Sequence, residues 1–160
     1  MVFVITAFAI AAFICTVIVL LINSIWDFRA RRVPNQMAFT GLVGAVVFSV
    51  LSDRIFEQPM TYLTSILLTL VLGYVLFKIG ALGGADVKAL LAIAIISPGV
   101  EFATWGNPIL EAILIVGLLF MATLMIGYVL SKKKTDENDI IPLIPIIMGV
   151  YLALQLLAFL

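Results

Sequence analysis

An uncharged apolar run opens the chain and constrains its fold more than any other feature. Met1 to Trp26 contains no charged side chain and is long enough to cross a membrane as a helix. A secretory signal peptide would have a basic start, a shorter apolar core and a small-residue cleavage site, so we expect this helix to be retained. Of all 160 residues, 64% are hydrophobic and 11% are charged. This composition is typical of a protein that crosses a membrane several times.

Further apolar stretches follow, separated by short polar connections. We therefore expect an all-α polytopic membrane protein, with one transmembrane domain over residues 1–160. About six transmembrane helices are predicted, at residues 1–26, 36–52, 62–77, 86–96, 109–130 and 140–160. The fourth stretch is short for a crossing. It either begins below the membrane surface, which would draw Asp86 inward, or continues with a kink through Phe102.

The nine basic residues are divided unequally between the connections. All except Arg54 lie near the first, third and fifth connections of the six-helix arrangement. The positive-inside rule then predicts that these three connections are cytoplasmic and that both termini lie outside. The same orientation places Asp27 and Asp86 at one membrane face, each at a helix end.

The residue types that the chain lacks exclude several kinds of site. The sequence has no histidine, which excludes a His-Glu-x-x-His zinc site, a Ser-His dyad and an imidazole base. One cysteine, Cys15, cannot form an intrachain disulfide. The formal net charge of zero does not indicate a nucleic-acid partner. We expect no metal and no cofactor, and we expect the lipid bilayer as the surroundings.

Asp27 and Asp86 are lone acids beside apolar helices, and Asp86 directly follows Gly83, Gly84 and Ala85. Glycine allows other groups to approach the backbone closely. Two carboxylates held together in a partly dry site do not both ionise easily, so one residue type supplies both an acid and a base. The ionised carboxylate can activate water for attack on a peptide carbonyl, while the protonated one binds the carbonyl oxygen. This pattern favours aspartyl proteolysis.

Structural roles for the same residues remain open at this point. Asp86 can be a helix N-cap, and both acids can be partners of nearby Arg29 and Lys88. Lys88 can extend to the membrane surface, or it can bias the ionisation of Asp86.

Three segments of the chain resemble one family. Gly83-Gly84-Ala85-Asp86-Val87-Lys88 is similar to the Gly-x-hydrophobic-Asp motif of the type IV prepilin peptidases, which are GxGD-type membrane aspartyl proteases. Asp27, followed by Arg31-Arg32-Val33-Pro34-Asn35, resembles that family's first aspartate and its basic-Ile-Pro-Asn segment. Ile141-Pro142-Leu143-Ile144-Pro145 resembles a proline-containing segment of the last helix.

The resemblance implies that Asp27 and Asp86 are the catalytic pair. It implies that the site is shaped by residues of the matching segments: Gly83, Gly84, Ala85, Lys88, Pro34 and Asn35. The implied substrates are class III signal peptides of pilins, archaellins or related proteins, cut at the cytoplasmic face of the cell membrane. The implied form is the short one, archaeal or Tad-type, without the methyltransferase region and without S-adenosylmethionine. The oligomeric state is not indicated.

Two competing interpretations use the same carboxylates. Presenilins and signal peptide peptidases also have a GxGD motif, but their first aspartate lies in a Tyr-Asp pair and a Pro-Ala-Leu motif follows. Here Trp26 precedes Asp27, and the sequence contains no Pro-Ala-Leu. A small ion- or proton-coupled transporter or channel subunit would also use membrane carboxylates, but it would place them near the midplane.

Overall fold

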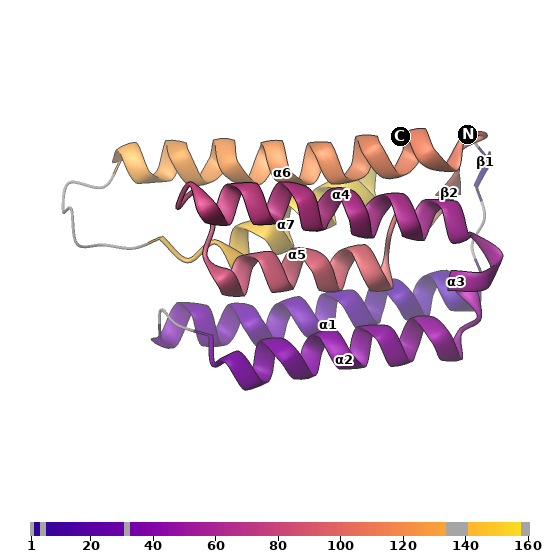
Figure 1. The fold of residues 1–160 in the computed structure, drawn as a ribbon, viewed down its shortest axis with the longest axis horizontal. Helices are drawn as coiled ribbons and strands as arrows, with labels where there is room; N and C mark the ends of the chain where they lie inside the picture. Colours follow the sequence, from indigo (N-terminus) through magenta and orange to yellow (C-terminus); the bar gives the residue numbers. More distant parts are fainter. Residues whose placement is uncertain (1, 4–5, 31–32, 134–140, 158–160) are drawn as a thin grey trace.

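A bundle of antiparallel helices makes up the computed structural model, which describes residues 2–3, 6–30, 33–133 and 141–157 (Figure 1). Its long helices are α1 (Ala7–Ala30), α2 (Asn35–Leu51), α4 (Pro59–Lys78), α5 (Gly84–Ile96), α6 (Pro108–Lys133) and α7 (Ile144–Leu157). A single short helix, α3 (Arg54–Glu57), joins α2 to α4. Strands β1 (Val2–Phe3) and β2 (Ala103–Thr104) form a short antiparallel pair.

The two ends of the bundle carry different groups, and we name them accordingly. At the aspartate end, on the left in Figure 1, α1, α4 and α6 end while α2, α5 and α7 begin. At the sheet end, on the right, lie α3 and the pair of strands. Segments that are far apart in the sequence therefore meet at each end.

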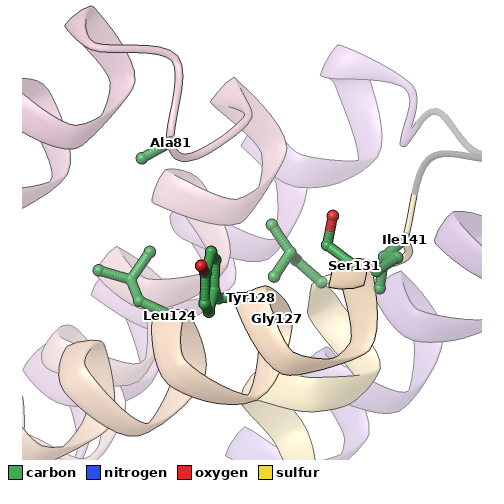
Figure 2. A pocket seen from close by; sticks show the side chains of 7 residues that line it. Ala81, Leu124, Gly127, Tyr128, Ser131 and Ile141 are labelled. Carbon is green, nitrogen blue, oxygen red and sulfur yellow. The ribbon is translucent and has the colours of Figure 1, made fainter. Parts of the chain in front are cut away.

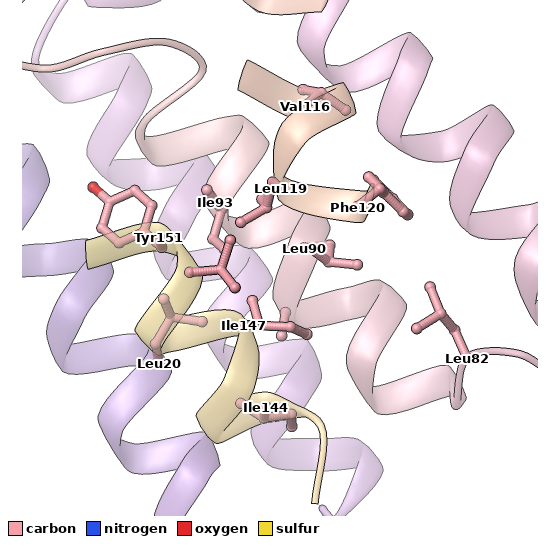
Figure 3. Close-up of a cluster of buried hydrophobic side chains, with 12 residues drawn as sticks. Leu20, Leu82, Leu90, Ile93, Val116, Leu119, Phe120, Ile144, Ile147 and Tyr151 are labelled. Carbon is pink, nitrogen blue, oxygen red and sulfur yellow. The ribbon is translucent and has the colours of Figure 1, made fainter. Parts of the chain in front are cut away.

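Helix α5 is the centre of the bundle. It packs against α1, α2, α4 and α7, and every residue from Ala92 to Ile96 is buried. A helix that is apolar on all sides is stable only when other elements enclose it. Figure 3 shows Leu90 and Ile93 of α5 within the core, among side chains from α1, α6 and α7 such as Leu20, Leu119 and Ile147. This enclosure holds the first turn of α5, with Asp86, at the aspartate end.

The outside of the bundle is apolar as well. Large hydrophobic side chains on α1, α2, α4 and α6 are exposed, among them Ile18, Val47, Val71 and Met121. A soluble protein rarely exposes so much contiguous apolar surface, whereas a lipid-facing surface requires it. By length and composition α1, α4 and α6 can each cross a membrane, and α2 and α7 are apolar but shorter. These are the features of a helical membrane protein.

The prediction that the first helix spans residues 1–26 is wrong at both ends. Its start is delayed because Val2 and Phe3 pair with β2, and the Thr6 hydroxyl accepts the Ala9 N–H at 3.1 Å as an N-cap. The helix then continues to Ala30 because no helix-breaking residue follows Asp27. Asp27 therefore lies inside the helix, about one turn before its end.

The fourth and last predicted helices are also corrected. Helix α5 ends at Ile96, so the alternative of a kinked continuation through Phe102 is wrong. Helix α7 begins at Ile144 because two prolines precede or occupy its first turn, where Pro145 needs no N–H partner. Arg31, Arg32 and residue 140, the start of the last predicted span, lie outside the described residues.

Candidate functional site

Asp27 joins α1 to the start of α7. Its Oδ2 accepts the backbone N–H of Ile144 at 3.1 Å. The first N–H groups of a helix have no partner within the helix, and the helix dipole favours negative charge there. The Asp27 carboxylate thus caps α7 from a position 117 residues away in the sequence, and this bond orients its side chain.

Asp86 is oriented by the loop that precedes its own helix. It is the third residue of α5, and its Oδ2 accepts the N–H of Gly83 at 2.9 Å. Gly83, rather than Asp86, is the N-cap residue. A Cβ at Gly83 would lie 2.9 Å from the same Oδ2, which is too close. A side chain at Gly83 would therefore require the Asp86 carboxylate to shift.

Both aspartates line one cavity of about 490 Å³ at the aspartate end. The rest of the lining comes from the end of the α1–α2 connection, the α4–α5 loop and the segment before α7: Val33, Gly80, Ala81, Leu82, Gly83, Gly84, Ala85, Ile141 and Leu143. Gly80 has a φ of 75°, a left-handed conformation that favours glycine and turns the loop toward the cavity.

The other residues of the sequence-predicted site fall into two groups. Gly83, Gly84 and Ala85 line the cavity of the aspartates, as just described. Lys88 instead donates a hydrogen bond to the Asn35 side chain, and both line a separate pocket of about 250 Å³. Pro34 is exposed and is the N-cap residue of α2. Lys88 therefore joins α5 to α2 and has its polar contact with Asn35.

The last helix takes part in the site in a way that was not predicted from the sequence. The segment Ile141–Pro145 was noticed for its prolines, which are a signal for a helix start. Nothing in the sequence showed that the Ile144 N–H binds Asp27, or that Leu143 lines the same cavity. The loop residues Gly80 to Leu82 were likewise not predicted as part of the lining.

A second group of acids, at the sheet end, was also missed. Glu101 is buried, and its Oε2 lies 2.7 Å from Nη1 of Arg54. Burial raises the pKa of Glu101 to about 6, although the positive charge of Arg54 opposes the shift. Glu111 accepts the N–H of Val100 at 3.0 Å and that of Trp105 at 3.3 Å. The only sequence signal was the presence of charge beside apolar helices.

Polar side chains of α7 complete this second group. The Gln155 side chain accepts the N–H of Glu101 at 3.0 Å and donates to the Gly99 carbonyl at 3.3 Å. The Tyr151 hydroxyl donates to the Ser97 hydroxyl at 3.0 Å. The two bonds of Gln155 satisfy buried backbone groups of the α5–α6 connection, where an unpaired group would be costly.

At the aspartate end, two acids line one open cavity. One carboxylate there can hold a proton while the other accepts one, which is what general acid–base catalysis on a polar bond requires. Within the described ranges, no three His, Cys, Asp or Glu side chains come together as they would to hold a metal ion.

Comparison with known proteins is informative at the level of the family. The model of the type IV leader peptidase family matches residues 14–131, a range that includes both aspartates and the glycines before Asp86. Neither the curated proteins nor the solved structures give a significant match. The matched range covers most of the chain and includes every described helix except α7, the start of α1 and the last two residues of α6. The chain belongs to the type IV leader peptidase family.

Proposed function

We propose that this chain is a membrane aspartyl endopeptidase. It removes the class III signal peptide from prepilin-like or preflagellin-like (archaellin-like) precursors at the cytoplasmic face of the cell membrane. The observation that carries the proposal is the cavity of about 490 Å³ that Asp27 and Asp86 line together. Membership in the leader peptidase family supports the same reaction class.

In this mechanism one carboxylate acts as the base and the other, protonated, acts as a hydrogen-bond donor. The ionised aspartate removes a proton from a water in the cavity, and the resulting hydroxide attacks the scissile carbonyl carbon. The protonated aspartate donates a hydrogen bond to the carbonyl oxygen as negative charge develops on it. The bonds from Ile144 and Gly83 each use the Oδ2 atom of one aspartate. They hold the side chains in place and leave the second oxygen of each for water or substrate.

The proposed orientation places the aspartate end in the cytoplasm, with six crossings and both termini outside. Basic residues support it: Arg29, Lys78, Lys88 and Lys132 lie toward the aspartate end, and Arg54 lies at the sheet end. Helix α5 has 13 residues, about 20 Å, which is less than the thickness of the hydrocarbon core. Burial of its second half, from Ala92 to Ile96, by other helices makes a short central helix compatible with this arrangement.

The test is a cleavage assay in membranes with a prepilin-like precursor, with the product identified by mass spectrometry. Asp27→Asn and Asp86→Asn keep the size of the side chain but cannot serve as the base. Each should lower the rate at least about a hundredfold, the low end for general acid–base catalysis. Asp53→Asn, at the sheet end, is the matched control and should cleave like the wild type. Full cleavage by either Asp27→Asn or Asp86→Asn would overturn the assignment of the pair.

Orientation has its own test, cysteine accessibility in intact cells on a Cys15→Ala background. Lys78→Cys should react only with reagents that reach the cytoplasm, and Glu57→Cys should react from outside. Labelling of Lys78→Cys from outside would contradict the proposed face.

A further inference from the structure

A second cavity, of about 510 Å³, adjoins the one that holds the aspartates. We call it the α6 recess. Its lining includes Leu124, Tyr128 and Ser131 of α6, together with Ala81, Ile141 and Leu143. Figure 2 shows Leu124, Tyr128 and Ser131 on α6, facing the space below the loop that carries Ala81. The last three lining residues, Ala81, Ile141 and Leu143, also line the cavity of the aspartates. The two spaces are therefore neighbours with a shared wall.

The side chains that line the α6 recess are apolar except for the hydroxyl groups of Tyr128 and Ser131. Among the described residues, no Asp, Glu, Lys or Arg lines it. The pocket of Lys88 and Asn35, which Gln36 and Phe39 also line, has no lining residue in common with the cavity of the aspartates. A peptide with its scissile bond at the two carboxylates thus has an apolar space adjoining it on the α6 side.

Close packing ties the recess to the aspartates. A Cβ at Gly127 would lie 3.0 Å from Cδ2 of Leu143, so α6 and the segment before α7 are in tight contact. Leu143 directly precedes Ile144, the residue whose N–H orients Asp27. Leu143, which lines the recess, and Ile144, which binds Asp27, are thus consecutive residues of the chain.

We propose that the α6 recess is a specificity pocket, and that it binds an apolar side chain of the substrate close to the scissile bond. This inference rests on the proposed peptidase function. It adds that the α6 recess determines which precursors are cut. The volume lies within the range of pockets that enclose whole small molecules, so a large aliphatic or aromatic side chain fits. Burial of that side chain also contributes binding energy that places the peptide bond at the carboxylates.

The test compares substrates that carry Ala, Leu or Phe at each position flanking the scissile bond. Wild-type enzyme should prefer Leu or Phe over Ala at one of these positions. Ser131→Trp, which fills the recess, should reduce that preference about tenfold or more, the scale for a change of about one methylene in an apolar pocket. It should still cut the Ala substrate. Tyr128→Ala enlarges the recess at an exposed position and should shift the preference toward the larger side chain.

Val129→Trp is the matched control, because Val129 is exposed on α6 and is absent from the lining of the recess. It should leave the preference unchanged. An unchanged preference in both Ser131→Trp and Tyr128→Ala would overturn the proposal. An effect of these variants on stability in lipid, without a change in preference, would also overturn it and assign the recess to a lipid chain.

A second measurement does not depend on the folding of a filled recess. A precursor with a photoreactive apolar residue at the preferred position is cross-linked to the Asp86→Asn protein. Attachment to the segment around Tyr128 supports the proposal, and attachment only to other helices contradicts it. If wild-type enzyme cuts no leader-bearing precursor at all, the proposed function fails; if it cuts but the preference does not move, only the α6 recess fails.

Discussion

The two ends of the bundle each hold a buried acid, but the carboxylates have different partners. Asp86 at the aspartate end and Glu111 at the sheet end are each 8% exposed. Glu111 accepts two backbone N–H groups, and its neighbour Glu101 is paired with Arg54. Asp86 accepts one N–H and lines a cavity together with Asp27. Burial alone therefore does not distinguish the candidate catalytic acids from the others.

What distinguishes them is the surroundings of the carboxylate oxygens. At the sheet end, the partners are a guanidinium group and the amides of the α5–α6 connection, so the acids hold this connection in place. At the aspartate end, each acid has one orienting bond from the described part of the chain and an adjoining space large enough for water and peptide. We expect changes at the sheet end to affect stability first, and changes at the aspartate end to affect activity first.

The largest expected effect on stability is at the ion pair of the sheet end. Arg54→Met leaves Glu101 buried without its cation, and breaking a buried pair in this way costs about 3 kcal/mol, the low end of the usual range because Arg54 is partly exposed. The free energy of unfolding in mixed SDS micelles measures it. Asp27→Asn, the change at the other end, should have a much smaller effect.

A double variant controls for this loss. Glu101→Leu combined with Arg54→Met removes both charges and should recover part of the stability, because no charge is left buried. Equal stability of the wild type and Arg54→Met would show that the ion pair does not hold the sheet end together.

The next largest effects are expected at two glycines, one at each end, that each lie beside a carboxylate. A Cβ at Gly99 would run into Oε1 of Glu111, just as a Cβ at Gly83 meets Oδ2 of Asp86. Gly99→Ala should lower the free energy of unfolding by about 1–3 kcal/mol, the range for overpacking. Gly83→Ala should mainly lower kcat by displacing the Asp86 carboxylate. Gly44→Ala, where a Cβ meets nothing within 4 Å, is the control.

The opposite pattern would reverse the assignment of the two ends. This would be a stable Gly99→Ala protein together with a fully active but unstable Gly83→Ala protein. Thermal unfolding in detergent and cleavage rates per folded molecule distinguish the two patterns.

We expect Glu101, at the sheet end, to make the stability of the protein depend on pH. The pKa of Glu101 is about 6 in the folded protein against an ordinary value of 4.5, so the folded protein binds more protons between these pH values. Protonation of Glu101 therefore stabilises the folded protein. This contribution to the free energy of unfolding is complete below pH 4.5 and is lost as the pH rises through 6. The change is at most about 2 kcal/mol.

Thermal unfolding between pH 4 and 7 tests this, with Glu101→Gln as the comparison. The midpoint of the wild type should fall as the pH rises across this window, and the slope should be smaller in Glu101→Gln. A slope that stays the same in Glu101→Gln would mean that another group causes it.

The smallest effect is expected at Lys88. Its hydrogen bond to Asn35 is at the surface, and exposed polar pairs contribute less than about 1 kcal/mol. Lys88→Met should therefore change stability little and leave the pH profile of kcat/KM in place. A shifted profile would instead support the alternative that Lys88 biases the ionisation of Asp86, and Lys88→Arg should then restore it.

Much of the fold could be predicted from the sequence, because apolar runs and charges are local features. All six predicted helices are present, with boundaries that differ most for the first and the last. Asp27 and Asp86 were assigned to one end by counting basic residues, before any contact between helices was known. The resemblance of the glycine-rich motif pointed to the family that the comparison then showed.

The contacts of the acids could not be predicted in the same way. The bond between Asp27 and Ile144 joins residues 117 positions apart, and the bond between Gln155 and Glu101 joins residues 54 apart. Hydropathy and helix propensity depend on neighbours in the sequence, so they carry no information about such pairs. The same applies to the α6 recess, which is lined from three separate segments.

The sequence by itself determined that this is a helical membrane protein with two lone aspartates at one end, since span length and charge position follow from composition along the chain. Only the tertiary structure decided which oxygens of which acids are occupied. Packing around α5 brings α1, α7 and the loop before Asp86 together at one end, and Arg54, Glu101 and Gln155 together at the other. At the first end each acid accepts a backbone amide and lines an open cavity, whereas a guanidinium group pairs with Glu101 at the second.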